Sequence, residues 1–215
     1  MSPGLEAILL DVLRVVFIFT GVMTLVPMLV LAERRISAVI QNRVGPNRVG
    51  PMGLLQPLAD VIKLLFKEDV MPNRADRVLY SLGPFLAFAP AAIAFIAIPV
   101  GRGLQVADLS VGVLYVLAVT SLGVYGISFG GWASNSKYPL LSSLRASAQL
   151  ISYEIAVTMT LVSVILTAGT LSMVGIVEAQ RDAGLWFGFV QPVAFVLIFI
   201  GGLAETNRAP FDLPE

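Results

Sequence analysis

One acidic side chain, Glu154, lies within an otherwise apolar run of residues. An acid at the centre of a membrane span costs about 2.5–3.5 kcal/mol to insert, and less nearer the interface. A residue in such a position is by default a candidate for a proton or ion relay. The alternative is a structural hydrogen bond that holds helices together. The sequence alone does not show which groups Glu154 faces.

Polar residues that precede Glu154 follow a helical spacing. Arg145, Gln149 and Ser152 are four and then three residues apart, so they form one stripe on a helix. Tyr153 lies one turn beyond Gln149, on nearly the same side. This stripe predicts a polar track that leads from the cytoplasm towards the acid.

The types of residue that are missing exclude several kinds of chemistry. The chain has no Cys and no His. It therefore cannot itself bind an iron–sulfur cluster, a His-ligated haem or a typical zinc ion, and it cannot form a His-dependent catalytic triad or a disulfide. Any proton chemistry must use Asp, Glu, Lys, Tyr or bound water.

Two Gly-Pro pairs punctuate the segment between the first two apolar runs. The stretch 43–51 reads RVGPNRVGP, and Gly53 follows it. Glycine permits a positive φ and proline fixes φ, so we expect a rigid series of turns. Its two arginines, Arg43 and Arg48, would face either an anion or an acidic partner surface. Alternatively, the segment is a spacer whose arginines meet lipid phosphates.

Residues 54–68 alternate with a helical period. Gln56, Asp60, Lys63 and Lys67 form a polar stripe, and leucines, Ile62 and Phe66 cover the opposite side. The segment is too short to cross a bilayer, which needs roughly 20 apolar residues. We expect an amphipathic helix that lies along the interface or covers a cavity between the spans; a plain surface anchor is the alternative.

The overall composition is that of a membrane protein. Of the 215 residues, 57% are hydrophobic and only 13% are charged, far fewer than in soluble chains. The 14 basic and 14 acidic residues cancel, so nothing suggests nucleic acid as a partner. We expect a single all-α, polytopic membrane domain with about five transmembrane helices, at about residues 7–32, 78–100, 111–132, 150–168 and 186–204.

The basic residues predict the orientation. Eleven of them fall in the predicted loops 33–77 and 133–149 or in the tail after residue 204. Only Arg14, Arg102 and Arg181 fall on the other face. The positive-inside rule then places the amino terminus outside and the long loop in the cytoplasm.

This orientation brings further charges to the level of Glu154. Glu33 ends the first run and Glu205 ends the fifth, so all three acids fall in the cytoplasmic third of the membrane. We expect a polar cavity open towards the cytoplasm; the alternative is that these charges simply meet headgroups. The candidate relay residues are Glu33, Arg145, Tyr153, Glu154, Glu205 and Arg208.

Several strings resemble one family in the order in which they occur. They are ERR at 33–35, GPNRVGP at 45–51, GLLQPLAD at 53–60, GWASNSKY at 131–138, SYE at 152–154 and AETNRAPFDLPE at 204–215. Together they closely resemble the H-subunit family of bacterial NADH:quinone oxidoreductase, respiratory complex I. The family has eight membrane helices, so the resemblance implies a chain truncated at its carboxyl end.

The resemblance implies a role for each group of residues. The family's members form much of a quinone chamber, whose entrance is bordered by the first loop and its amphipathic helix. The implied chamber and entrance residues are Arg34, Arg35, Arg43, Gly45, Pro46, Asn47, Arg48, Gln56, Asp60, Lys63, Phe66, Asp212 and Glu215. Glu154 and Glu205 would belong to a glutamate chain that couples quinone reduction to proton translocation.

The resemblance also implies cofactors, partners and location. The substrate would be ubiquinone or menaquinone, and flavin and iron–sulfur clusters would reside in partner subunits. Partners would be the peripheral-arm iron–sulfur and quinone-site subunits, small membrane subunits, antiporter-like subunits and lipid. The resemblance favours the bacterial inner membrane as the location over a chloroplast or mitochondrial membrane. It also implies that this chain alone would hold no complete active site.

Two related interpretations stay open at the level of sequence. The chain could be the membrane subunit of an energy-converting hydrogenase, or of a complex I-like dehydrogenase with another electron donor. The GPNRVGP loop and the string from Glu205 to Glu215 favour the quinone enzyme. A stand-alone transporter would show internal repeats with broken helices, and the sequence has no repeat of fixed period.

Overall fold

The structure is a computed structural model that describes residues 3–208 and residue 211. The regular secondary structure of the described part is helical, and the sole β-type pairing there is an isolated bridge between Gly101 and Leu104. Within that part, four helices are long and apolar enough to cross a bilayer: Leu9–Ile40, Arg77–Ala94, Gly112–Ala133 and Lys137–Ala168. The prediction of an all-α, polytopic membrane protein is confirmed. The chain divides into two compact units, residues 1–70 and 71–215, and each is described by itself.

The first unit consists of one long helix, a turn-rich loop and a short helix. Helix α1 (Pro3–Ile40) continues beyond the predicted span and contains Pro27 in its interior. A 3₁₀ turn, η1 (Pro51–Gly53), precedes α2 (Gln56–Leu65), which forms within the predicted amphipathic segment. The leucines and Phe66 on the apolar side of α2 are exposed within this unit.

Backbone geometry explains why the loop needs a glycine at residue 53. Gly53 has a φ of +76°, and a Cβ placed there would lie 2.1 Å from the carbonyl oxygen of Pro46. A side chain at residue 53 is therefore excluded both by conformation and by space. The amide of Leu55 donates to the carbonyl of Val49 at 3.2 Å, which closes the turn. The predicted series of turns is what the structure contains.

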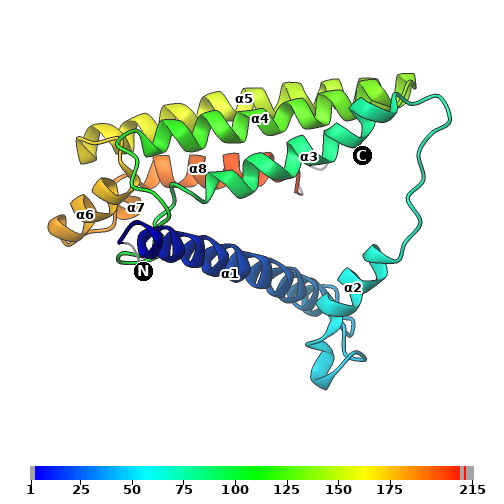
Figure 1. Ribbon diagram of the computed structural model, residues 1–215, viewed down its shortest axis with the longest axis horizontal. Helices are drawn as coiled ribbons and strands as arrows, with labels where there is room; N and C mark the ends of the chain where they lie inside the picture. Colours follow the sequence, from blue (N-terminus) through cyan, green and yellow to red (C-terminus); the bar gives the residue numbers. More distant parts are fainter. Residues whose placement is uncertain (1–2, 209–210, 212–215) are drawn as a thin grey trace. The chain divides into compact units, whose positions relative to one another are not determined.

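The second unit places four apolar helices side by side (Figure 1). They are α3 (Arg77–Ala94), α4 (Gly112–Ala133), α5 (Lys137–Ala168) and α8 (Pro192–Glu205). Contacts link α3 to α4, α4 to α5, and α5 to α8. Two shorter helices, α6 (Met173–Ala183) and α7 (Phe187–Val190), connect α5 to α8.

Hydrogen bonds between loops show which helix ends meet. The amide of Asp76 donates to the carbonyl of Ala133 at 2.9 Å, so α3 begins where α4 ends. At the opposite end, the amide of Val113 donates to the carbonyl of Leu171 at 3.0 Å. The four apolar helices of this unit therefore alternate in direction.

Glycine lets α3 and α4 approach closely. A Cβ at Gly126 would lie 2.7 Å from both the amide nitrogen of Ala87 and the carbonyl oxygen of Gly83. Gly83 in turn faces the backbone of Gly126 and Gly130. Small residues that allow backbones to touch are the usual means of packing helices in membranes, where burial of apolar surface supplies no driving force.

Helix α5 begins well before the predicted span at Leu150. The expectation of a loop over residues 133–149 is wrong for the part from Lys137 onward. This part is rich in serine, which lowers its hydropathy but does not prevent a helix. Ser143 and Ser147 are buried, so the segment forms because it packs.

The fifth predicted run forms two helices rather than one. Helix α7 ends at Val190 and α8 begins at Pro192, with Gln191 in a non-helical conformation between them. Proline has no amide hydrogen and disfavours a helical residue before it, which explains the break. The side chain of Gln191 stabilises this break by hydrogen bonds with Ser163 and Thr167 on α5. Another predicted run is also shorter as a helix, because α3 ends at Ala94 and the prediction extended to Val100.

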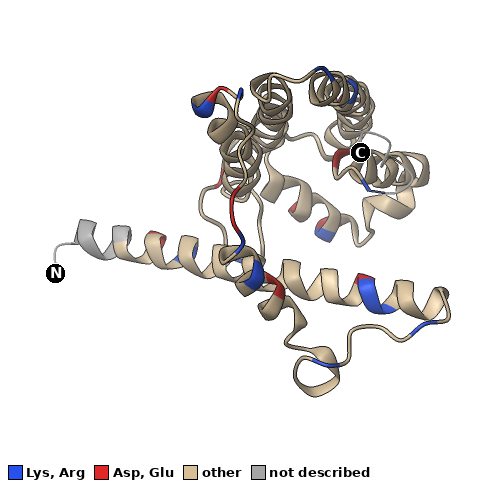
Figure 2. Ribbon diagram, turned by 90° about the vertical axis from the view of Figure 1, so that its right-hand side faces the viewer, with Lys and Arg blue, Asp and Glu red and all other residues tan. Residues whose placement is uncertain are grey.

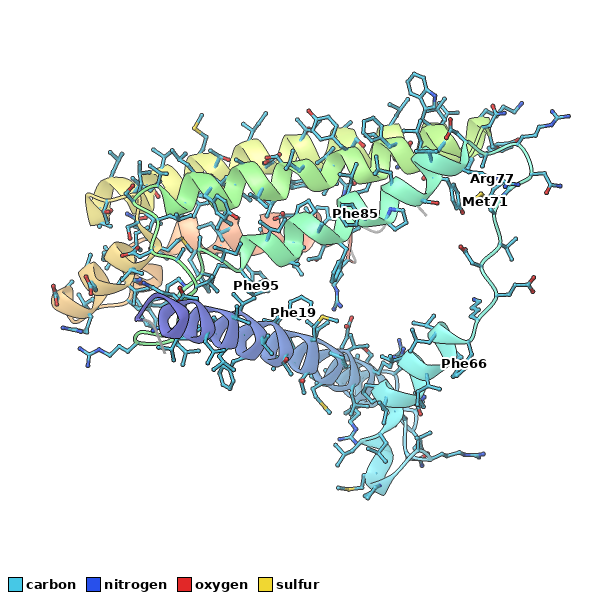
Figure 3. All side chains as sticks on the ribbon, viewed as in Figure 1. Phe19, Phe66, Met71, Arg77, Phe85 and Phe95 are labelled. Carbon is cyan, nitrogen blue, oxygen red and sulfur yellow. The ribbon has the colours of Figure 1, made fainter. Side chains whose placement is uncertain are left out.

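The outer faces of the second unit are apolar. Phe85 on α3 points away from α4 and α5 and is 64% exposed (Figure 3). Leu166 on α5 and Trp132 on α4 are exposed as well. Such surfaces suit contact with lipid or with other membrane subunits.

Candidate functional site

Among the described residues, Glu154 is the one acid that lies between the ends of the apolar helices α3, α4, α5 and α8. Glu205, in contrast, is the last residue of α8. Most of the charged residues of this unit, blue and red in Figure 2, lie in loops or near helix ends. The position of Glu154 is thus set by the length of α5, which carries it several turns inward from Lys137.

The carboxylate of Glu154 has a specific neighbour on α4. The hydroxyl of Ser121 donates a hydrogen bond to Oε1 of Glu154. Both residues are half-buried at the contact between α4 and α5. This contact answers the question left open by the sequence, because it identifies a group that Glu154 faces.

A cavity of about 310 Å³ brings the two acids of this unit together. Glu154 and Tyr153 line it from α5, and Glu205 and Thr206 line it from the end of α8. The remaining wall is mostly apolar: Ala87, Pro90, Ala91, Thr120, Gly123, Val124, Ile127, Leu150 and Gly201. The two carboxylates therefore line one cavity, and its acidic groups lie on the α5 and α8 side.

The polar track that was predicted along α5 has a different use in the structure. Gln149 donates to the carbonyl oxygen of Phe211 at 3.1 Å, and the ring of Tyr153 meets the ring of Phe211 edge-on at 4.9 Å. These two residues hold Phe211, which follows α8 in the sequence. Ser152 is exposed and bonds back to Ala148 within its own helix, so it does not continue the track.

The other predicted relay residues lie apart from the cavity wall. Arg145 and Arg208 are exposed, on α5 and just beyond α8, and neither lines the cavity. Glu33 belongs to the first unit and lies on α1. Of the predicted set, the cavity brings together Tyr153, Glu154 and Glu205.

In the first unit, two arginines of α1 hold the loop and α2. Arg34 donates to Oδ2 of Asp60 at 2.5 Å, and Gln56 donates to Oδ1 of the same carboxylate at 3.2 Å. Arg35 donates to the carbonyl oxygen of Met52 in η1. Three predicted entrance residues, Arg34, Gln56 and Asp60, therefore form one cluster, and Arg35 stands beside it.

The remaining entrance residues are on the surface of the loop or of α2. Arg43 is exposed and bonds to the side chain of Gln41 at 2.6 Å. Asn47, Arg48 and Phe66 are exposed, and Gly45 packs against Ala38 at the end of α1. Pro46 supplies the carbonyl that abuts Gly53, and Lys63 lies in the last turn of α2. Asp212 and Glu215 lie outside the described residues.

The contact of Asp60 with Arg34 should depend on pH, and the direction of the dependence follows from the pKa of Asp60. Hydrogen bonds from Arg34 and then Gln56 lower the pKa of Asp60 below its ordinary value. A lowered pKa in the folded state means that the contact is fully formed when the pH is above the pKa of the unfolded chain. The contact is lost as the pH falls through the pKa of the folded chain. At neutral pH, Asp60→Asn is expected to speed hydrogen exchange in α2 roughly two- to fivefold, as for an exposed ion pair.

Hydrogen exchange measured by mass spectrometry on the intact complex checks this prediction. Lys67→Gln, which leaves the cluster intact, is the control and should exchange like the wild type. The difference between wild type and Asp60→Asn should vanish when both are compared at one strongly acidic pH. Equal exchange at neutral pH would contradict the role of the contact.

Two features of the site were not found from the sequence. Ser121 was missed because its relation to Glu154 depends on how α4 and α5 are aligned, which single-chain periodicity does not reveal. The close approach at Gly126 was also missed. The spacing of Gly126 and Gly130, with three residues between them, was a usable signal, since it is the pattern of small residues typical of membrane helix contacts.

Comparisons with known proteins agree on one family. Residues 13–215 match the family model described as NADH dehydrogenase. The chain is 51% identical to an H subunit of the NADH-quinone oxidoreductase of Geobacter metallireducens, with all of this chain and 68% of that protein covered. It is 50% identical to the H subunits of the NADH-quinone oxidoreductases of Rickettsia canadensis and Rickettsia bellii, with 94% of this chain and 60% of each relative covered.

Proposed function

Since this chain belongs to the NADH dehydrogenase family that includes the H subunits of NADH-quinone oxidoreductases, we propose that it borders the quinone chamber of such an enzyme and couples quinone reduction to proton translocation. The chain spans 60% of the length of the Rickettsia relatives, so these activities are proposed for the assembled enzyme. This chain alone would hold no complete active site.

The observation that supports the coupling role most strongly is the cavity shared by Glu154 and Glu205. Two carboxylates that line one mostly apolar cavity influence each other, because a charge on one disfavours a charge on the other. A change of charge at one of them would therefore be felt at the other. Such a pair is suited to pass a change in charge from one end of a site to the other.

The chemistry of quinone supplies the charge change. A quinone has an apolar tail and a polar head, so its site needs an apolar passage that ends among polar groups. Reduction by two electrons to the quinol takes up two protons. A nearby carboxylate would respond to that change in charge, and Glu154 and Glu205 would transmit the response towards the antiporter-like subunits.

The first unit would form the border of the entrance. Arg34 and Arg35 hold the loop and α2 by side-chain contacts, so the turn-rich segment has a defined position on the end of α1. The apolar side of α2 is uncovered within the unit. It would provide an apolar surface past which the quinone tail slides from the lipid.

The proposed orientation follows from the charges at the two ends of the second unit. Five basic residues of its described part lie at the end where α3 begins and α8 finishes: Arg74, Arg77, Lys137, Arg145 and Arg208. Two, Arg102 and Arg181, lie at the other end. The positive-inside rule puts the first end in the cytoplasm and therefore places Glu205 near that face.

The enzyme would be a complex of the bacterial inner membrane with several partner subunits. Flavin and iron–sulfur clusters would reside in the peripheral subunits, in keeping with a chain that has neither Cys nor His. Ubiquinone or menaquinone would be the substrate. Small membrane subunits, antiporter-like subunits and lipid would surround the apolar faces of the helices.

Purification of the intact membrane complex from the source organism tests this proposal. Mass spectrometry should find this chain together with NADH-binding, iron–sulfur and antiporter-like subunits, and extraction should yield bound quinone. A complex that contains hydrogenase subunits and no quinone would overturn the proposal. A complex with quinone but without NADH-binding subunits would overturn the choice of electron donor.

A further inference from the structure

The contact between α4 and α5 repeats with a spacing of seven residues. Ser128 on α4 meets Ser147 on α5, with 2.8 Å between their hydroxyl oxygens. Seven residues earlier on α4 and seven later on α5, Ser121 meets Glu154. Antiparallel helices that keep this register present equivalent positions to each other once per heptad. These two contacts, Ser128 with Ser147 and Ser121 with Glu154, form one seam between the helices. In this seam Glu154 occupies the position on α5 that is equivalent to that of Ser147.

The hydroxyl of Ser121 has one hydrogen, but two acceptor oxygens lie within its reach. Its hydroxyl oxygen lies within bonding distance of the Glu154 carboxylate and also 2.7 Å from the carbonyl oxygen of Leu117. A serine hydroxyl carries one hydrogen and two acceptor lone pairs, so it can donate to only one of these oxygens at a time. Whether the hydroxyl donates to the Glu154 carboxyl group or to the Leu117 carbonyl depends on whether Glu154 carries a proton.

The two arrangements are both complete. When Glu154 is ionised, the Ser121 hydroxyl donates to the carboxylate. When Glu154 is protonated, its own O–H donates to the Ser121 oxygen, and the Ser121 hydrogen rotates towards the Leu117 carbonyl. The serine loses no proton and gains none; only the direction of its O–H changes.

A second hydroxyl lowers the cost of this rotation. Thr120 also donates to the carbonyl oxygen of Leu117, at 3.1 Å. That carbonyl therefore keeps a side-chain donor when Ser121 turns away. A buried acceptor that lost its partner would oppose the change, and the Leu117 carbonyl does not lose its partner.

We propose that Ser121 is a positioning residue that holds the Glu154 carboxyl in both of its protonation states by reversing the direction of its hydroxyl. This inference rests on the proposed relay role of Glu154. It adds a second component on the neighbouring helix: Ser121 keeps the carboxyl in one place while its charge changes. Without the hydroxyl, the side chain of Glu154 would be free to turn within the cavity and would transfer protons less efficiently.

Replacement of Ser121 in the intact complex tests this assignment. Ser121→Ala is expected to lower the kcat of NADH:quinone turnover about three- to tenfold, as for loss of one ordinary hydrogen bond, and to leave the KM for quinone unchanged. Ser121→Thr restores the hydroxyl and should recover turnover. Ser128→Ala removes a hydroxyl from the same seam one heptad away and should behave like the wild type.

Infrared difference spectroscopy supplies a readout that packing alone would not move. The redox-induced band of the protonated Glu154 carboxyl is identified as the band lost in Glu154→Gln. In Ser121→Ala this band should move to higher wavenumber, because the carboxyl no longer donates to a serine oxygen. In Ser121→Thr and Ser128→Ala it should stay in place.

The outcomes separate this inference from the proposal on which it rests. If Glu154→Gln retains wild-type turnover, the relay role itself is wrong. If Glu154→Gln is inactive while Ser121→Ala keeps both the turnover and the carboxyl band of the wild type, the relay role stands and the assignment of Ser121 is overturned. A loss of turnover that Ser121→Thr does not rescue, with an unmoved band, would also overturn it.

Discussion

Glu154→Gln is expected to reduce NADH:quinone turnover by about 100-fold or more, the usual contribution of a positioned acid–base group, while the complex still assembles. Glutamine keeps the size of the side chain and its ability to accept from Ser121. It cannot take up or release a proton. Turnover should therefore fail without any loss of packing between α4 and α5.

Turnover is measured with NADH and a short-chain quinone in membranes, and assembly is followed by native electrophoresis. Glu178→Gln provides the matched control, because Glu178 is an exposed acid on the short helix α6, away from the cavity. The control should have wild-type turnover. An assembled Glu154→Gln complex with full turnover and full proton pumping would refute the relay role.

Gly126→Ala is expected to reduce the amount of assembled complex roughly tenfold, because an overpacked contact costs about 1–3 kcal/mol. The added Cβ would lie 2.7 Å from backbone atoms of α3, at Ala87 and Gly83. Backbone atoms at the centre of a helix cannot move aside as a flexible side chain can. The two helices would have to separate along their contact.

The same helix offers a control for this substitution. A Cβ at Gly123 meets no atom within 4 Å, so Gly123→Ala should assemble normally. Both variants change a glycine to alanine in α4, so any general effect on helix propensity is shared. Quantitative native electrophoresis compares the two, and equal assembly of both would contradict the importance of the close approach at Gly126.

Features that depend on one helix were predictable from the sequence. The helix over residues 56–65 follows from a polar stripe with a helical period, and the turns before it follow from paired glycine and proline. The cost of an acid in an apolar run singled out Glu154 before any neighbour was known. These features depend only on local spacing and on the free energy of burying a charge.

Features that depend on how helices are aligned were not predictable in this way. The contact of Ser121 with Glu154 requires the register of α4 on α5, and hydropathy does not contain it. Hydropathy also placed the start of α5 too late, because buried serines near Lys137 lower the average although they pack well. The break at Gln191 depends on one proline within a run that is otherwise mostly apolar.

Reduction of quinone should change the protonation of Glu154, and the coupling role depends on this change above all. Redox-induced infrared difference spectra of the intact complex, with carbon-13 in the glutamate carboxyls, measure it directly. We predict an isotope-sensitive carboxyl band in the wild type that is absent from Glu154→Gln. A band of unchanged position and intensity in Glu154→Gln would contradict the coupling role.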